Sequence, residues 1–310
     1  MKRKNFKSIA GLTLIEILIG VVVSSIMMAA IYTTYSIVNT TYSQVLEKAK
    51  VSRSSRDIIE LLIRDTRMAG FKYYLGDNDR GLPKESYLEF VGGASSIKES
   101  HDPIVIIPQQ LGHSIEDTIP TPPRKHNLLD SCCDKIHIVY DDFNQNDDTQ
   151  PYKRYKLTYF ARPLSDTDRD GNIINQRYGI YKSKISWEQD IGQEEGEWIP
   201  DCSECYHNEL IRDYVEDMEF IALDKDGKVL TPYPNTLTEE SRRNLYKIRA
   251  IDIRIAFISE KPFFRFESRQ GKERQLTGFS RTPRSFSDRN LRDNVVVTVY
   301  TRNIVGQEIF

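Results

Sequence analysis

The chain contains 310 residues, of which 39% are hydrophobic and 28% are charged. This composition is typical of a globular protein and excludes an intrinsically disordered chain. The formal net charge is −2, and the sequence has no basic stripe of the kind that binds nucleic-acid phosphates, so we expect no nucleic acid among the partners.

The N-terminal segment is basic and lies directly before a long apolar run. No charged residue occurs from Ile17 to Leu46, which is enough chain to cross about 30 Å of hydrocarbon as a helix. Positive charge before such a helix keeps the N-terminus in the cytoplasm and sends the rest of the chain outward. The basic residues before Gly11 are Lys2, Arg3, Lys4 and Lys7.

One acidic residue, Glu16, lies at the start of this apolar run. A carboxylate at mid-helix in a membrane costs about 2.5–3.5 kcal/mol, so a residue of this kind usually pairs with an opposite charge. An ordinary secretory signal peptide would have a shorter apolar region and a clean small-residue cleavage site. A plain signal anchor would explain the length and the charge bias, but it would not explain the glutamate.

The segment from Met1 to Gly11, followed by Leu-Thr-Leu-Ile-Glu, resembles the leader and first mature residues of type IV prepilins. In that family a prepilin peptidase, which is also an N-methyltransferase, cuts after the glycine on the cytoplasmic side. The resemblance implies cleavage between Gly11 and Leu12 and N-methylation of Leu12. It also implies that the carboxylate of Glu16 pairs with the N-terminal amine of a neighbouring subunit. Leu12 departs from the family, in which phenylalanine is usual at that place.

The helix is expected to continue beyond the membrane. Residues 43–70 contain no proline and carry apolar residues at helical spacing, and Gly70 is a natural stop signal. The predicted organisation is a cleaved leader over 1–11, one long helix over 12–70 with its transmembrane part at about 12–38, and an extracytoplasmic head over 71–310.

Beyond the helix the hydrophobic period changes to two. Alternation is clearest in "DKIHIVYDD" and "RAIDIRIAFIS", and it recurs in "KRYKLTYFA", "YGIYKSKI" and "NVVVTVYTRNI". The pairs Asp170-Gly171 and Asp226-Gly227 indicate hairpin turns. Because few helical patterns separate these strands, we predict an α+β fold in which a long N-terminal helix carries an antiparallel β-sheet head. The resemblance to pilins implies the same arrangement.

Several segments of the head are similar to PilW-type minor pilins: "LIRDTRMAGF", "LIRDYVEDMEFIALDKDG" and the pair "IRAIDIRIAFIS" and "VVVTVYTRNI". The resemblance implies a minor pilin that helps to initiate type IV pilus assembly and sits in the tip complex. Its partners would be the major pilin, other minor pilins and a tip adhesin. The head would lie in the periplasm before assembly, anchored in the inner membrane, and at the pilus tip or cell surface afterwards. Two alternatives stay open: a J-like minor pseudopilin of type II secretion and a tip-borne adhesive binding module.

The four cysteines fall into two pairs, Cys132-Cys133 and Cys202-x-x-Cys205. Disulfides are favoured over zinc in an outward-facing head, because adjacent ligands make poor tetrahedral geometry. Free or redox-active thiols are the remaining alternative. Of the three possible connectivities, we expect cross-links that join the first pair to the second.

The stretch "DTDRDGNIINQR" begins like a calcium-binding loop. Gly171 lies where such a loop turns sharply, but Arg177 occupies the place of the closing glutamate. Two interpretations stay open, a polar hairpin turn and a Ca²⁺ site. The ligands of that site would be Asp166, Asp168, Asp170 and Asn172.

No catalytic constellation stands out, so we expect no enzyme activity, no catalytic residue and no required cofactor. The five histidines are dispersed and none lies in a nucleophile motif or at a metal-pair spacing. His137 alternates with Ile136 and Ile138 and is therefore predicted to be a surface residue.

Overall fold

The structure is a computed structural model. It describes residues 13–71, 102–108, 132–143, 152–167, 173–188, 197–234, 238–264, 274–279 and 283–304. The chain divides into two compact units, Met1–Ala49 and Lys50–Phe310. The second unit is the head, and it includes the C-terminal turns of the long helix.

The first element, α1, is a helix of 55 residues from Leu14 to Met68, as the proline-free sequence predicts. It ends where Gly70 adopts a positive φ of 72°, a conformation that glycine reaches without the steric penalty of a Cβ atom. A Cβ at this position would lie 3.2 Å from Cγ1 of Ile304. The backbone N–H of Gly70 donates to the carbonyl of Val139 at 2.8 Å, so the end of the helix is tied to the sheet.

The main sheet contains eight strands, all paired antiparallel. Its order is β1-β2-β3-β4-β6-β7-β10, with β5 attached to β4. The bounds are β1 Ile104–Ile107, β2 Lys135–Phe143, β3 Tyr152–Thr167, β4 Ile173–Glu188, β5 Glu197–Ile199, β6 Tyr206–Leu223, β7 Ala250–Ile258 and β10 Arg292–Tyr300. The predicted α+β class, a long N-terminal helix with an antiparallel sheet, is confirmed.

At both predicted hairpin positions, the segments before and after the Asp-Gly pair lie side by side. Strands β3 and β4 pair up to Thr167 and Ile173, on either side of Asp170-Gly171, although that turn itself lies outside the described residues. At the second position, Gly227 has a φ of 74°. There the Asp224 carboxylate accepts the backbone N–H of Lys228 at 2.8 Å, a side-chain bond that stabilises a turn.

Three smaller elements complete the described head. Helix α2 covers Glu239–Leu245 and is capped by Thr238, whose hydroxyl accepts the N–H of Ser241. Strands β8 (Arg274–Leu276) and β9 (Arg284–Phe286) form a separate two-stranded sheet.

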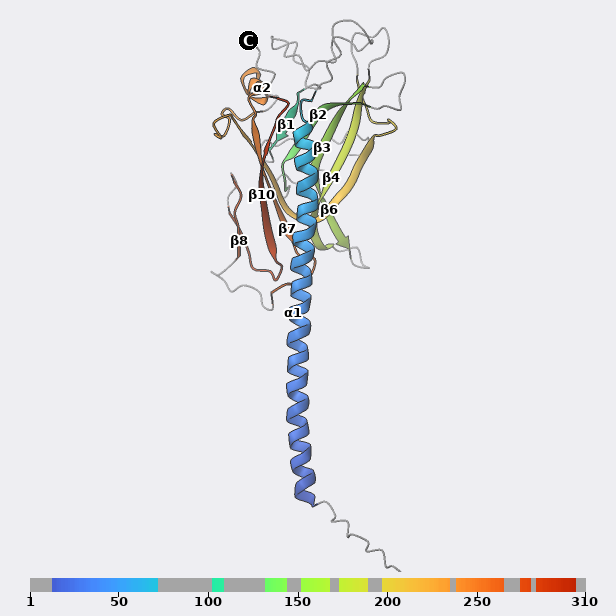
Figure 1. The fold of residues 1–310 in the computed structure, drawn as a ribbon, viewed down its shortest axis with the longest axis vertical. Helices are drawn as coiled ribbons and strands as arrows, with labels where there is room; N and C mark the ends of the chain where they lie inside the picture. Colours follow the sequence, from blue (N-terminus) through green and yellow to red (C-terminus); the bar gives the residue numbers. More distant parts are fainter. Residues whose placement is uncertain are drawn as a thin grey trace, which may run out of the picture. The chain divides into compact units, whose positions relative to one another are not determined.

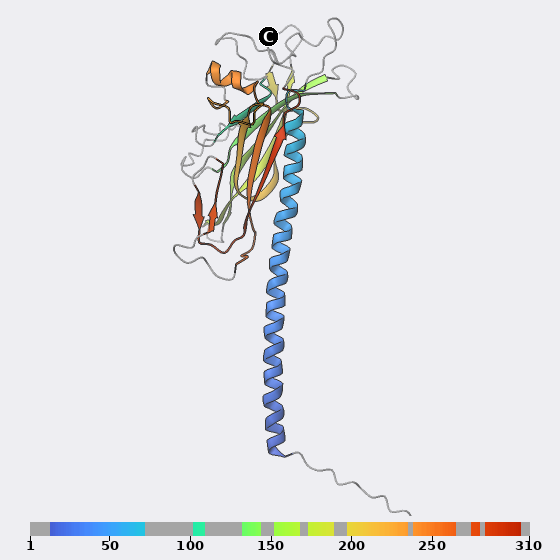
Figure 2. The same cartoon turned by 60° about the vertical axis from the view of Figure 1, so that its left-hand side comes forward.

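The core lies between the C-terminal turns of α1 and one face of the main sheet. Figure 1 and Figure 2 both show these turns running along the sheet. Ile58, Leu62 and Ala69 belong to the same buried cluster as sheet residues such as Ile253 and Phe257. Full burial of a side chain such as Leu62 stabilises the fold by about 1.5–3 kcal/mol. Packing on the sheet therefore anchors this part of the helix in the head.

Candidate functional site: the exposed helix and its glutamate

The N-terminal part of α1 is apolar and exposed. Every residue from 13 to 43 is exposed, including large side chains such as Leu14 (81%), Ile31 (67%) and Tyr35 (68%). Among the described residues, α1 is the one helix long and apolar enough to cross a membrane by length and composition. An apolar surface of this length is stable only when lipid or other protein covers it.

Five of the hydroxyl groups on this stretch bond to carbonyl groups within the helix. Ser24 donates to the carbonyl of Val21 at 3.0 Å, and Thr33 donates to the carbonyl of Ala29 at 2.7 Å. Ser25, Thr34 and Thr40 make bonds of the same kind. Because these polar groups are satisfied locally, they do not oppose burial of the helix in an apolar environment.

Glu16 lies in the first turn of α1 and bonds to Thr13. The backbone N–H and the hydroxyl of Thr13 donate to Oε2 of Glu16, at 2.8 and 2.9 Å. The N–H of Glu16 donates to the Thr13 hydroxyl at 3.4 Å. This is a capping box, which satisfies amide groups that the first turn of a helix leaves free. Glu16 thus has a local role as well as the intermolecular one that the sequence suggests.

The two oxygens of the Glu16 carboxylate differ in their surroundings. Both bonds from Thr13 go to Oε2, and no described residue donates to Oε1 of Glu16. The group can therefore cap its own helix through Oε2 and still accept a hydrogen bond from a cation at Oε1. Gly11 and Leu12, the predicted cleavage and methylation residues, lie outside the described residues.

The cysteines pair differently from the expectation. Cys132 bonds to Cys133 and Cys202 bonds to Cys205, with Cα–Cα distances of 3.7 and 4.8 Å. The predicted disulfides exist, but the predicted cross-links between the two pairs are wrong. The reason is local: each cysteine finds its partner within its own short segment, so neither bond joins one long loop to the other.

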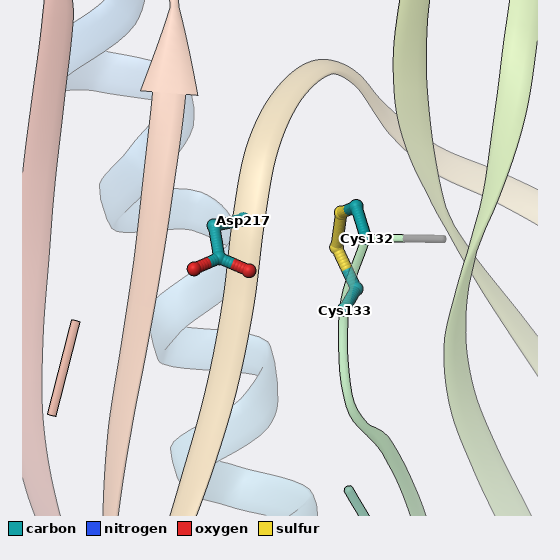
Figure 3. Close-up of side chains that lie close together, drawn as sticks. All are labelled: Cys132, Cys133 and Asp217. Atoms are coloured by element: carbon teal, nitrogen blue, oxygen red, sulfur yellow. A yellow bond between two sulfur atoms is a disulfide. The ribbon is translucent and has the colours of Figure 1, made fainter. Parts of the chain in front are cut away.

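The first disulfide lies beside a buried carboxylate. Figure 3 shows Cys132 and Cys133 next to Asp217 of β6, and the three potential ligand atoms lie within 4.8 Å of one another. Sulfur atoms joined in a disulfide are not thiolate ligands. Asp217 also makes an ion pair with Arg254 at 2.9 Å. In this oxidised state the cluster does not supply a three-ligand metal site.

The aspartate-rich stretch falls largely outside the described residues. Asp166 is part of β3, and the other three proposed calcium ligands, Asp168, Asp170 and Asn172, lie outside the described residues. The calcium interpretation therefore stays a prediction.

His137 is not the surface residue that the alternation predicts. It is half-buried on β2, and its Nδ1 lies 2.8 Å from the hydroxyl of Thr158 on β3. Burial lowers the pKa of His137 well below its ordinary value, and the nearby charges of Lys135 and Lys156 lower it further. The side chain does point away from the core, as predicted, but it remains neutral at neutral pH.

A buried polar cluster joins α1 to the sheet, and the sequence analysis missed it. Asp65 of α1 accepts the hydroxyl of Tyr159 (β3) at 2.5 Å and lies 2.7 Å from the ammonium of Lys182 (β4). The side chains of Asp65 and Lys182 are only 7% and 6% exposed. Burial, and next the charge of Asp65, raise the pKa of Tyr159, so its hydroxyl stays protonated and remains a donor.

A signal for this cluster is present in the sequence. Asp65 follows Leu62 by three residues and precedes Ala69 by four, which places it on the same helix face as these buried residues. A carboxylate on a buried helix face needs a partner. The helical period alone could have identified Asp65 as such a residue, but it could not identify Lys182.

Comparison with known proteins gives distant similarity to solved structures. No family description matches the chain, and no curated protein matches it. Among solved structures, a type IV-like pilin from Thermus thermophilus is similar, with a TM-score of 0.37 and 10% sequence identity. The similarity covers 82% of this chain and 98% of that one. A similarity this distant leaves the function to be argued from the chain's own residues.

Proposed function

We propose that this chain is a minor pilin that helps to initiate type IV pilus assembly and sits in the tip complex of the filament. One observation carries the proposal: a single helix is exposed and apolar over residues 13–43, and its last turns form part of the core of a β-sheet head. Such a helix can be stored in a membrane and then covered by the helices of other subunits. This role is structural and needs no catalytic residue.

The proposal includes removal of the leader. Prepilin peptidase would cut between Gly11 and Leu12 and methylate the new N-terminal residue, Leu12. This cut would place a free amine one residue before Thr13, the cap of α1. The apolar helix would then begin directly at the N-terminus.

Glu16 would recognise the amine of a neighbouring subunit during assembly. A buried carboxylate without an opposite charge is costly, so a subunit with a charged neighbour in the correct register is strongly favoured. Oε1 of Glu16, which receives no bond from the described residues, supports this role. The contact with Thr13 orients the carboxylate through Oε2.

The proposed partners follow from the same mechanism. Other minor pilins and the major pilin would cover the exposed helix, and a tip adhesin would contact the head. Before assembly the head would lie in the periplasm, with the helix in the inner membrane. A head built from residues 50–310 is large for repeated use along a slender filament, which favours the tip.

The test is the intact mass and the N-terminal sequence of the protein from membranes of cells with and without prepilin peptidase. We expect residues 1–11 to be lost and one methyl group to be added to Leu12 in peptidase-containing cells alone. A full-length N-terminus in both strains would contradict the proposal, because no amine would then be available near Glu16. Co-purification of the processed protein with pilus components or with type II secretion components would distinguish a pilus role from a secretion role.

A further inference from the structure

The two edges of the main sheet differ in their protection. Strand β1 forms one edge; it has four residues and lies between Pro103 and Pro108. Short strands and prolines prevent another strand from adding to an edge. Strand β10 forms the other edge and has nine residues. Among the described strands, it pairs with β7 alone.

From Asn294 onward, the β10 edge lacks the usual protective features. From Asn294 to Thr301 the sequence is "NVVVTVYT", which contains no charge, no proline and no glycine. The register with β7 runs without a bulge. A long, neutral, β-branched edge in water promotes association with other strands. A protein that keeps such an edge normally has a partner to cover it.

The hydrogen bonds of β10 show which backbone groups face outward. The N–H of Thr301 donates to the carbonyl of Arg249 at 3.0 Å, and the carbonyl of Leu291 accepts from Ser259 at 2.8 Å. Alternate residues of an antiparallel strand bond to opposite sides. The odd-numbered residues therefore bond toward β7, and the even-numbered ones present their N–H and C=O groups at the edge. In the uncharged part of the strand these residues are Asn294, Val296, Thr298 and Tyr300.

The side chains of the same four residues are also exposed. Val296 is 55% exposed and Tyr300 is 69% exposed. An added strand would gain backbone hydrogen bonds from the edge and, on one face, contacts with an aliphatic and an aromatic side chain. Cross-strand pairs of this kind stabilise a sheet.

We propose that β10 is a docking edge for an extended segment of a different protein chain, which is uncharged apart from one acidic residue and joins the sheet as its next strand. The segment carries β-branched or aromatic residues opposite Val296 and Tyr300 and an acidic residue opposite Arg302, which is exposed just beyond the strand. This recognition mode is strand addition, in which backbone bonds supply affinity and side chains supply specificity. It does not depend on the proposed pilus role.

The charges around the edge favour a different chain over a second copy. Two copies related by a two-fold axis would pair their β10 strands antiparallel. Registers that keep equivalent faces together would place an even-numbered residue between Asn290 and Tyr300 of one copy opposite Arg302 of the other, and none of these residues is acidic. A second copy therefore does not neutralise Arg302 in these registers, whereas an acidic residue of another protein does.

The test uses the full chain in detergent and a fluorescent peptide of about nine residues. The peptide alternates threonine and valine after one N-terminal glutamate, and its binding is measured by fluorescence anisotropy. Val296→Pro removes an outward N–H and blocks the edge, but no bond to β7 uses that N–H. Val296→Thr is the matched control, because it keeps both the N–H and the β-branched shape. We expect the wild type and Val296→Thr to bind equally and Val296→Pro to bind about tenfold or more weakly.

A second measurement keeps the proposal testable if Val296→Pro does not fold. Two further peptides carry N-methyl groups on alternate amides, one on the odd-numbered residues and one on the even-numbered residues. Only one of the two should lose binding to the wild type, because only alternate amides of an added strand face β10. Absence of peptide binding, or equal binding by both methylated forms, would overturn the proposal. A concentration-dependent dimer of the wild type that Val296→Pro abolishes would assign the edge to a second copy and would also overturn it.

Discussion

His137 lies at a strand position whose side chain points away from the hydrophobic core, yet it is half-buried and bonds from β2 to β3. Its bond to Thr158 does not require a charge, whereas an imidazolium would be poorly solvated and close to two lysines. The same position would be an ordinary surface histidine on an isolated hairpin. Its altered pKa is therefore a property of the packed sheet.

The stability of the head should fall in mild acid because of His137. In the unfolded chain this histidine takes up a proton near pH 6.5, but its folded-state pKa is lower. The unfolded state therefore binds more protons below pH 6.5, and stability falls by up to about 1.4 kcal/mol per pH unit until the folded-state pKa is reached. Above pH 6.5 this contribution is fully present.

The measurement compares the wild type with His137→Gln by denaturant unfolding between pH 7 and pH 5. Glutamine can bond to Thr158 but does not titrate in this range. As the pH falls from 7 to 5, the unfolding free energy of the wild type should decrease more than that of His137→Gln. Parallel pH profiles would show that His137 titrates normally in the folded state.

Disulfide pairing is also decided at the level of single residues. Non-reducing tryptic digestion should leave Cys132 and Cys133 in one peptide and Cys202 and Cys205 in another, because Lys135, Arg154 and other cleavage sites lie between the pairs. Each peptide should gain the mass of two hydrogens on reduction. A single cross-linked species that contains both peptides would contradict this pairing and would support the cross-links expected from the sequence.

At the level of elements, apolar packing and a buried charged contact hold α1 to the sheet. Asp65 meets Lys182 and Tyr159 in the interior, where removal of the Asp65 carboxylate leaves the buried ammonium of Lys182 without its counter-charge. Replacement of a whole buried pair by apolar residues is often tolerated, whereas removal of one member is strongly destabilising. The contact therefore specifies how the helix docks.

Asp65→Ala should lower the free energy of unfolding of the head by about 3–5 kcal/mol. The double substitution of Asp65→Leu with Lys182→Met should recover most of this loss, because no buried charge then remains uncompensated. Glu60→Ala, at an exposed position of the same helix, is the control and should change stability by no more than about 0.5 kcal/mol. Thermal and denaturant unfolding in detergent measure all three. Equal losses in the single and double variants would argue against the charge explanation.

At the level of the whole molecule, one helix contributes to two different environments. Its last turns are covered by the sheet of the same chain, and its first turns are exposed. Under the proposed pilus role, Glu16 would contribute to assembly and not to the stability of the head. A variant at this residue should therefore separate folding from assembly.

Glu16→Gln should leave the unfolding temperature of the head unchanged and lower the amount of the protein in sheared pili about tenfold or more, since an unpaired buried amine is costly. Thr13→Ala is the matched control, because it removes the hydroxyl contact to Glu16 and keeps the carboxylate. We expect Thr13→Ala to assemble nearly normally. Equal defects in the two variants would show that Glu16 acts through the helix cap alone.

The sequence by itself determined the long helix, its end at Gly70, the positions of the main strands and the antiparallel class. These features depend on short-range properties: the absence of proline, periods of 3.6 and two, and glycine at turns. It also determined that the first half of the helix is apolar and carries Glu16. Each of these properties can be read from residues close together in the chain.

Tertiary structure alone decided which polar residues became buried and which partners they met. Arg254 alternates outward from Ile253 and Ile255, but it is buried and bonds to Asp217 and Glu219 of β6. The N–H of Phe279, from the segment after β8, donates to the same Glu219. Alternation indicates which face a side chain points to, but what covers that face depends on segments far away in the sequence. The same reason explains the burial of His137, the pairing of Asp65 with Lys182 and the open edge of β10.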